Sequence, residues 1–321
     1  MTGRSLALYV ARRLVALALL LIVVSFLVFT LLYIAPGSPE QVLLGTRPSS
    51  PDVIASLRAQ FHLDEPFLEQ YWIWLGGAVQ LDFGESIRTG RSVVSSLGER
   101  VGVTLYLGVY AFVVALVAGL PLGILAAVRK RSVVDRTVVG VSVLGVSAPA
   151  FVTGVFLLYV FAVALGWFPS YGAGEGFTDR FWHLTLPAAA LALTAMALIV
   201  KLTRTAMIGA LDQDYVAFAR ARGVSAHRVI VRHALRNALV PIITAAGLVL
   251  TIVLTGAVLV EQTFALPGLG TLLVESVTNK DLPMLQGVAM VLATLIVVVN
   301  LLVDILYAAV DPRIRFGRGS S

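Results

Sequence analysis

Six long apolar stretches divide this chain, and polar segments of unequal length separate them. A helix needs about 20 mainly apolar residues to cross the hydrocarbon core of a bilayer. The pattern therefore predicts an all-α, polytopic membrane protein with six transmembrane helices. The expected spans are Leu14–Ile34, Val101–Val128, Val133–Leu165, Leu184–Val200, Leu239–Val260 and Met284–Val310.

The first apolar stretch follows Arg12 and Arg13, an arrangement that secretory signal peptides share. It is longer than the apolar core of such signals, which has about 7–15 residues, and no A-x-A cleavage site follows it. We therefore expect a retained first helix. Pro121 and Pro149 lie inside the second and third stretches. They predict kinks packed against other helices, where the freed carbonyl groups can find partners.

Small residues recur within the second and fourth stretches. In lipid, small side chains let helix backbones approach closely, and packing then drives helix association. We interpret these residues as contact surfaces of a compact bundle rather than as a specific site. They are Gly108, Ala115, Gly119, Gly123, Ala188, Ala189, Ala190, Ala192, Ala195 and Ala197.

Residues 36–100 form a long segment between the first two expected spans and carry many acidic side chains. We expect this segment to be folded and exposed to water. Two amphipathic pieces, Pro51–Phe61 and Glu69–Leu75, predict helices, and Trp72 and Trp74 suit the headgroup level of a membrane. An interfacial helix and a role in receiving substrate are both open for this segment.

The composition agrees with a membrane protein and excludes a soluble one. Hydrophobic residues make up 58% of the chain, charged residues 13%, and the mean hydropathy is +0.92. Soluble domains are about 25% charged. The chain has no cysteine, which excludes disulfides, thiolate metal sites and a cysteine nucleophile. The net charge of +6 does not indicate a nucleic-acid partner, because the basic residues concentrate in particular loops.

The basic residues predict how the chain is oriented, since Lys and Arg favour the cytoplasmic side of a membrane. The N-terminus, the links after spans two and four, and the C-terminal tail carry 17 of the 24 Lys and Arg residues. Both termini are therefore expected in the cytoplasm, as an even number of spans requires.

Signatures of enzymes and of ion-coupled carriers are missing from the sequence. The chain has neither H-E-x-x-H nor a G-x-x-x-x-G-K-[ST] phosphate cradle, so we expect no ATPase activity and no bound cofactor. Asp304, in the cytoplasmic half of span six, is a candidate for lining a translocation pathway. Such a group more often pairs with a nearby cation or reaches the membrane interface.

The link between spans four and five is long and patterned. Asp212 or Asp214 can cap a short helix that runs to about Arg222. Gly223 then suits the position that ends a helix, since glycine enters the left-handed region without strain. Ser225 can cap a second helix.

The second helix is expected to be amphipathic. Its cationic row and its apolar row each repeat every four residues, so each row would occupy one face of an α-helix. A helix anchored on anionic lipid and a docking element for a cytoplasmic protein are both consistent with this pattern. The two rows are Arg228, Arg232 and Arg236, and Val231, Leu235 and Leu239.

The first helix of the link resembles the cytoplasmic loop in permeases of binding-protein-dependent ABC importers. That family has an E-A-A-x-x-x-G signature, which here reads A-F-A-R-A-R-G at Ala217–Gly223, with alanine in place of the leading glutamate. The peptide-importing branch has a D/E-Y-V-x-x-A-R-A-K-G pattern, matched by Asp214–Val216 and Ala219–Gly223. Similar motifs extend over nearly the whole chain at Asp82–Ser86, Ser147–Phe151, Arg232–Pro241, Phe264–Gly270, Asp281–Gly287 and Asp311–Arg315.

The motifs are similar to those of the B-type permeases of dipeptide and oligopeptide importers. The resemblance implies a type I ABC importer permease fold in the bacterial plasma membrane. It implies as partners a second homologous permease, two cytoplasmic ATP-binding subunits that hold ATP and Mg, and an extracytoplasmic peptide-binding protein. It also implies a coupling helix that seats in an ATP-binding subunit. The residues assigned to that helix are Asp214, Tyr215, Ala217, Phe218, Ala219, Ala221 and Gly223.

Nickel and glutathione importers share these motifs, so their permeases are alternatives for the cargo. A secondary carrier that works without ATPases is an alternative of another class, which the patterned cytoplasmic loop disfavours. The expected organisation has four parts: the N-terminal segment with span one (1–35), an extracytoplasmic segment (36–100), the permease core (101–310) with a coupling loop at 208–238, and a cytoplasmic tail (311–321).

Overall fold

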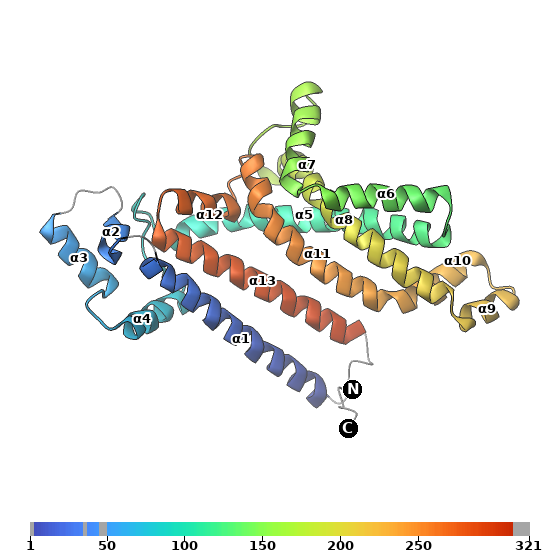
Figure 1. Ribbon diagram of the computed structural model, residues 1–321, viewed down its shortest axis with the longest axis horizontal. Helices are drawn as coiled ribbons and strands as arrows, with labels where there is room; N and C mark the ends of the chain where they lie inside the picture. Colours follow the sequence, from blue (N-terminus) through green and yellow to red (C-terminus); the bar gives the residue numbers. More distant parts are fainter. Residues whose placement is uncertain (1–2, 35–36, 45–49, 311–321) are drawn as a thin grey trace. The chain divides into compact units, whose positions relative to one another are not determined.

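The computed structural model describes residues 3–34, 37–44 and 50–310, and almost all of them lie in helices or the turns between helices (Figure 1). Among these residues the only β-pairing is an isolated bridge between Glu85 and Ser92. The all-α prediction is therefore confirmed. The motif at Asp311–Arg315 and the rest of the expected tail lie outside the described residues.

Five helices in the described part of the chain are long and apolar enough to cross a membrane. Each contains one of the expected spans, although most begin earlier or end later than the apolar stretch itself. The fifth span, α11, continues from a short α-helix, α10 (Ala226–Arg228), through a π-helix, η2 (Val229–Leu235). The five are α1 (Gly3–Ile34), α5 (Val93–Val128), α8 (Gly176–Leu211), α11 (Arg236–Thr263) and α13 (Leu282–Val310).

The third expected span is broken rather than kinked. It forms α6 (Val133–Ser147), then α7 (Ala150–Leu157) and the π-helix η1 (Leu158–Ala164), and the two arms are bent by 99°. Ala148, before Pro149, has the extended angles φ −96° and ψ 123°, because a following proline disfavours the helical conformation. Counted as one span, the bent pair gives the six that the sequence predicts.

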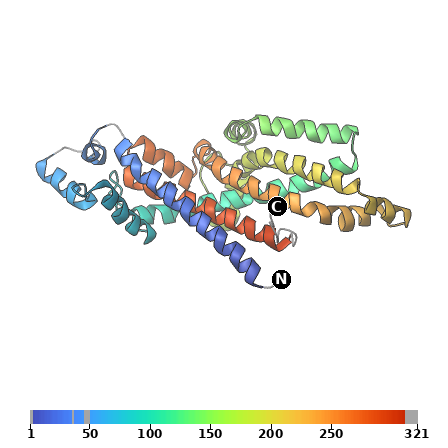
Figure 2. The same ribbon diagram turned by 60° about the horizontal axis from the view of Figure 1, so that its bottom comes forward.

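The helices form two compact units. Of the described residues, the first contains 3–10, Leu105–Leu266 and 299–310, and in it α8 packs against α6, α7 and α11 (Figures 1 and 2). A Cβ on Gly119 would lie 2.8 Å from Ile199 Cγ2, and one on Gly123 would lie 2.7 Å from Thr203 Cβ. Only glycine allows so close an approach of α5 to α8, which confirms the predicted use of small residues in helix packing.

The second unit contains Ala11–Thr104 and Pro267–Val298. Besides the adjoining parts of α1, α5 and α13, it holds the shorter helices α2 (Pro39–Leu44), α3 (Pro51–Phe61), α4 (Phe67–Val79) and α12 (Leu269–Thr278). The helix predicted at Pro51–Phe61 is confirmed, and its N-cap is Ser50, whose side chain accepts a hydrogen bond from the backbone N–H of Val53.

Two of the sequence motifs meet in this second unit. Asp281 caps the start of α13, and its carboxylate accepts hydrogen bonds from the Ser86 hydroxyl at 2.5 Å and the Ile87 N–H at 3.2 Å. A Cβ on Gly287 would lie 2.5 Å from Val93 Cγ1. The motifs at Asp82–Ser86 and Asp281–Gly287 therefore hold the loop before α5 against α13.

In the segment between α1 and α5, helix α4 packs on α1, so this part is less exposed to water than the sequence predicts. In α4 the rings of Phe67, Tyr71 and Trp74 pack on rings of α1, with Trp74 5.6 Å from Phe29 between ring centroids. Trp74 is thus partly buried, whereas Trp72 is exposed. The helix predicted at Glu69–Leu75 is also longer, because the apolar run continues to Val79.

Candidate functional site

The predicted coupling helix is α9 (Asp214–Ala221), between α8 and α10. The prediction that Asp212 or Asp214 caps it is wrong. The N-cap is Gln213, whose side chain makes no capping hydrogen bond. Asp214 occupies the first turn, where its charge still suits the positive end of the helix dipole. Asp212 instead follows the last residue of α8.

Gly223 ends α9 as the sequence predicts. Its φ of +76° lies in the left-handed region. The N–H of Gly223 donates to the carbonyl of Arg220 at 3.0 Å, and the N–H of Val224 donates to that of Ala219 at 3.1 Å. These two bonds make the Schellman motif, which satisfies the last carbonyls of the helix and fixes its end sharply.

Tyr215 and Val216 fasten α9 to its neighbours. Val216 is only 1% exposed. The Tyr215 hydroxyl donates to the carbonyl of Ala210 in α8 at 3.3 Å and accepts from Asn237 Nδ2 of α11 at 2.9 Å. One side chain thus joins α9 to the ends of two expected spans. The sequence predicts Tyr215 as part of the coupling surface; its hydroxyl makes these two hydrogen bonds, while the residue stays 38% exposed.

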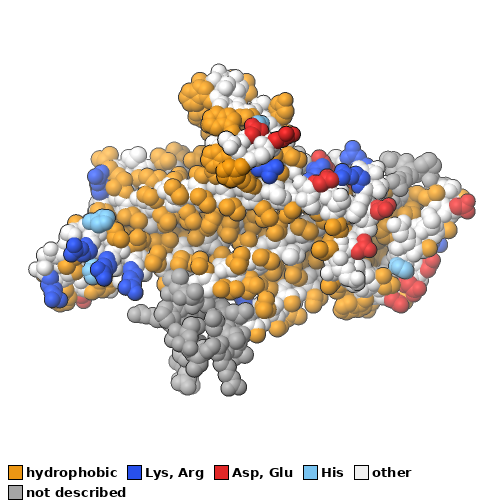
Figure 3. Space-filling view, turned by 180° about the vertical axis from the view of Figure 1, so that it is seen from behind, with side chains coloured by type: hydrophobic (Ala, Val, Ile, Leu, Met, Phe, Trp, Pro, Cys, Tyr) orange, Lys and Arg blue, Asp and Glu red, His pale blue; other side chains and the backbone are white. Residues whose placement is uncertain are grey.

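The rest of α9 is open. Phe218 is 70% exposed, Asp214, Ala217 and Ala221 are exposed, and Ala219 is partly buried. One exposed apolar ring is common on protein surfaces, so Phe218 suggests docking only together with the fixed, sharply ended helix that carries it. Figure 3 shows Lys, Arg and His side chains gathered at the end of the first unit that carries α9 and α10. The exposed face of α9 therefore presents one large apolar side chain, Phe218, within a basic surface.

The amphipathic helix that follows α9 differs from its prediction in register. Ser225 is the N-cap of α10, as expected, but its side chain makes no capping bond. The π-turn of η2 makes the buried positions Val229 and Ala234 five residues apart, and α-helical spacing returns at Ala238. The predicted apolar row at Val231, Leu235 and Leu239 is thus not the buried row, and Val231 and Leu239 are exposed. Arg228, Arg232 and Arg236 are all exposed.

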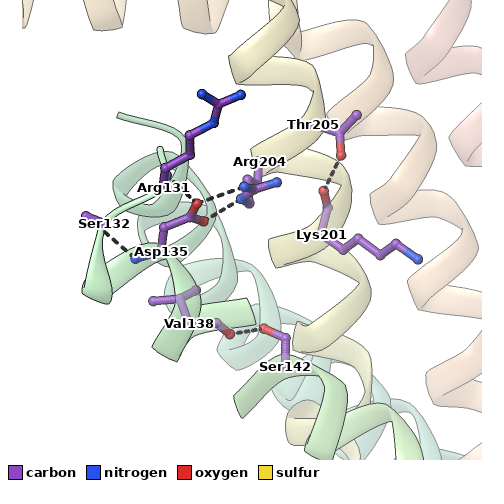
Figure 4. Close-up of polar contacts among 8 residues, drawn as sticks. All are labelled: Arg131, Ser132, Asp135, Val138, Ser142, Lys201, Arg204 and Thr205. Atoms are coloured by element: carbon purple, nitrogen blue, oxygen red, sulfur yellow. Dashed lines mark hydrogen bonds and ion pairs between the residues drawn. The ribbon is translucent and has the colours of Figure 1, made fainter. Parts of the chain in front are cut away.

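Two ion pairs tie the start of α6 and the preceding turn to α8. Lys130 Nζ lies 3.0 Å from Asp212 Oδ2, and both side chains are well exposed. Arg204 reaches Asp135 through two bonds, Nε to Oδ1 at 2.6 Å and a terminal guanidinium nitrogen to Oδ2 at 2.8 Å (Figure 4). The Asp135 side chain is only 5% exposed. Such a bidentate pair fixes both distance and orientation between α6 and α8.

Sequence reasoning missed the Asp135–Arg204 pair, because the two residues are 69 positions apart. One local signal was available. Ser132 caps α6 and accepts from the N–H of Asp135, while the Asp135 carboxylate accepts from the N–H of Arg131 at 2.8 Å. The S-x-x-D pattern indicates a helix start. It does not indicate which cation the carboxylate binds.

Comparison with known proteins places the chain in a family. Residues 119–316 match the model of the binding-protein-dependent transport system inner membrane component, and residues 6–108 match the N-terminal membrane component of the same systems. The chain belongs to this family of ABC importer permeases. It is 39% identical to the glutathione transport system permease protein GsiC of Shigella flexneri and of Escherichia coli K12, over 96% of this chain and 99% of each relative.

A solved structure of the MetNI methionine ABC transporter, in an inward-facing conformation, shares the fold of this permease. The TM-score is 0.58 at 20% identity, and the match covers 67% of this chain and 96% of the other. The permease is therefore a multi-pass protein of the bacterial inner membrane with the type I importer fold, and the family is one of transport subunits, not of ATPases.

The candidate pathway residue of the permease, Asp304, is partly buried in α13. Near it, α13 packs closely on α11: a Cβ on Gly247 would lie 2.2 Å from Val303 Cγ1, and the Thr251 hydroxyl donates to Asn300 Oδ1 at 3.2 Å. These contacts position Asp304, and its role in transport stays a prediction. Within residues 3–34, 37–44 and 50–310, no group of three or more His, Asp or Glu side chains is arranged to hold a metal ion.

Proposed function

We propose that this permease works in an ATP-driven importer and that α9 is its coupling helix, seated in a cytoplasmic ATP-binding subunit. The observation that carries the proposal is a short, sharply ended helix that exposes Phe218 and is fastened to α8 and α11. The other subunits would be a second homologous permease, two ATP-binding subunits that hold ATP and Mg, and an extracytoplasmic binding protein.

The contacts around α9 suit the transmission of force. A coupling element must move as one body with the spans that it drives, since flexible attachments would absorb the displacement. The Tyr215 hydroxyl links α9 to α8 and α11, and the bidentate Asp135–Arg204 pair links α8 to α6. A push on Phe218 would therefore reach three helices of the first unit together.

We propose short peptides as the cargo. The motifs resemble those of peptide importers, and the curated relatives at 39% identity are glutathione permeases, so glutathione, itself a small peptide, is the second candidate. Mass spectrometry of the ligand retained by the co-purified binding protein tests both. A retained peptide other than glutathione supports the first candidate, retained glutathione supports the second, and a retained metal chelate without peptide contradicts both.

A cysteine crosslink tests the coupling helix directly, because the natural chain has no cysteine. We expect Phe218→Cys to crosslink to a cysteine in the ATP-binding subunit of the reconstituted transporter, with a yield that changes when ATP binds. Arg129→Cys, at an exposed position in the turn after α5, is the control and should crosslink less. If an impermeant reagent added outside intact cells labels position 218 as strongly as it does in opened cells, the proposal is contradicted.

Substitution of Gly223 tests the geometry of the helix end. We expect Gly223→Val to abolish uptake at normal membrane abundance, because valine is strained at a φ of +76°. Gly209→Val is the control, since a Cβ at either position meets no atom within 4 Å and only Gly223 has a positive φ. Normal uptake by the Gly223 variant would show that the sharp stop is dispensable.

The exposed arginines after α9 test recruitment. We expect Arg232→Glu to reduce the amount of ATP-binding subunit that co-purifies with the permease, as expected for a basic surface at an interface. If Arg232 instead binds anionic lipid, recruitment stays normal and membrane seating of the loop weakens. Arg129→Glu controls for the loss of positive charge as such.

A further inference from the structure

Helix α4 has the reverse of the surface expected for a helix in water. Its exposed side chains include Leu68, Trp72 and Val79, which are 62%, 61% and 77% exposed. Its buried residues include Gln70 and Tyr71, at 6% and 4%. Single exposed apolar residues are common in soluble proteins, but a helix that hides its polar groups and shows its apolar ones needs an apolar medium.

The buried polar groups of α4 are all turned toward protein partners. Gln70 Nε2 donates to the carbonyl of Glu65 at 2.7 Å, and Gln70 Oε1 accepts from the Tyr33 hydroxyl. The Tyr71 hydroxyl lies 2.9 Å from Ser25 Oγ and donates to the carbonyl of Ile22 at 3.3 Å. No polar side-chain group of these two residues is left facing outward, as a lipid environment demands.

The partner of Tyr71 gives the depth of α4. The membrane-spanning part of α1 is Ala11–Ile34, and Ile22 lies twelve residues before its end. At 1.5 Å per residue this is about 18 Å along the helix axis, more than half of a hydrocarbon core about 30 Å thick. A side chain that bonds to Ile22 therefore reaches the middle of the bilayer.

The other contacts of α4 agree with this depth. Ala78, near its end, belongs to the same apolar cluster as Val288 of α13, another spanning helix. The single charged residue of α4, Glu69, is in its first turn, two residues from Phe67. The Phe67 ring lies 5.0 Å from that of Tyr33 at the outer end of α1, so this charge is near the level of the headgroups.

We propose that α4 is a re-entrant helix that lies within the leaflet at the Ile34 end of α1, with Leu68, Trp72 and Val79 against lipid chains. The chain enters this leaflet after α3 and leaves it before α5, without crossing the membrane. The occupant of the apolar face is lipid rather than a protein, because Phe26, an exposed residue of the transmembrane helix α1, has its ring 5.9 Å from that of Phe67 in α4. The inference goes beyond the proposed transport function and does not depend on it.

Spin labels on the permease in lipid vesicles test the proposal. Single cysteines replace Trp72 or Leu68, and Arg58→Cys on the exposed helix α3 and Ala78→Cys in the apolar cluster are the controls. We expect the labels at 72 and 68 to collide several-fold more often with oxygen, which concentrates in lipid, than with a water-soluble nickel complex. The label at 58 should show the opposite preference.

Two outcomes would overturn the proposal. Nickel collisions at position 72 as frequent as at position 58 would place α4 in water, and protection from both reagents, as at position 78, would mean that a protein covers it. The native Trp72 is a second probe that avoids new side chains at the face. With Trp74, Trp167 and Trp182 changed to Phe, brominated lipid chains should quench its fluorescence, and an absence of quenching would contradict the inference.

Discussion

Helices α9 and α4 are both short and both lie between spanning helices, yet they place most of their polar side chains in opposite ways, at the surface in α9 and in the interior in α4. The eight-residue α9 buries Val216 and exposes its two charged residues, Asp214 and Arg220, beside Phe218. In α4 the polar residues Gln70 and Tyr71 are buried, and Leu68 and Trp72 are exposed. The two helices teach that burial alone does not identify a core. The polarity of what is exposed reports the surrounding medium.

The two helices are also attached to their neighbours by different kinds of contact. Hydrogen bonds of Tyr215 hold α9, and the ion pairs of Asp135 and Lys130 brace the neighbouring helices. Ring packing holds α4 on α1, with few but buried hydrogen bonds. The exposed ion pair of Lys130 and Asp212 weakens with salt, whereas ring packing does not.

The largest expected effect is on the α4 side of this comparison. Tyr71→Ala should lower the free energy of unfolding by about 3–5 kcal/mol, because it removes a fully buried ring. Trp72→Ala, at the next position, should cost less than about 1 kcal/mol, because that ring is exposed. Thermal unfolding of the purified variants in the same detergent measures both. Equal losses would mean that α4 is not packed on α1 through Tyr71.

The buried ion pair should come next. Asp135→Asn should cost about 3 kcal/mol, the low end for an unpaired buried charge, because the Arg204 side chain is still 27% exposed. The double variant Asp135→Leu with Arg204→Met removes both charges and should recover most of the loss. A double variant as unstable as the single one would show that the charges themselves are not the cause.

Variants of Tyr215 and Phe218 distinguish two roles within α9, attachment to the neighbouring helices and docking to a partner. Tyr215→Phe removes one hydroxyl that makes two hydrogen bonds and should cost about 1 kcal/mol in unfolding free energy. Phe218→Ala should leave thermal stability unchanged, because the ring is exposed, but should impair uptake if α9 is the coupling helix. Normal uptake with Phe218→Ala in the complete transporter would argue against that role.

The smallest effect is expected at the exposed pair of Lys130 and Asp212. Lys130→Met should change the unfolding free energy by about 0.2–1 kcal/mol, and the difference should shrink at high salt, since exposed pairs are screened. Unfolding at low and high ionic strength measures this. A large, salt-independent loss would place Lys130 in the buried network with Asp135.

Much of the candidate site followed from local sequence. The position of α9, its end at Gly223 and the start of the next helix at Ser225 all depend on residues within one or two turns. The prediction that an aspartate caps α9 was wrong, because Gln213 occupies the N-cap position, between Asp212 and Asp214. The apolar row after Ser225 was wrong because one π-turn shifts the register of everything beyond it.

The sequence by itself determined the number of apolar stretches, the expected orientation of the chain and the glycines at which helices meet or end. Only the tertiary structure decided that the chain breaks at Pro149 yet remains helical through Pro121 and Pro187, that Arg204 binds Asp135, and that α4 packs on α1. The physical reason is the distance along the chain over which each interaction acts. Hydrophobic length, charge and the conformational freedom of glycine are properties of local residues. What a proline, a carboxylate or an aromatic ring does depends on partners far away in the chain.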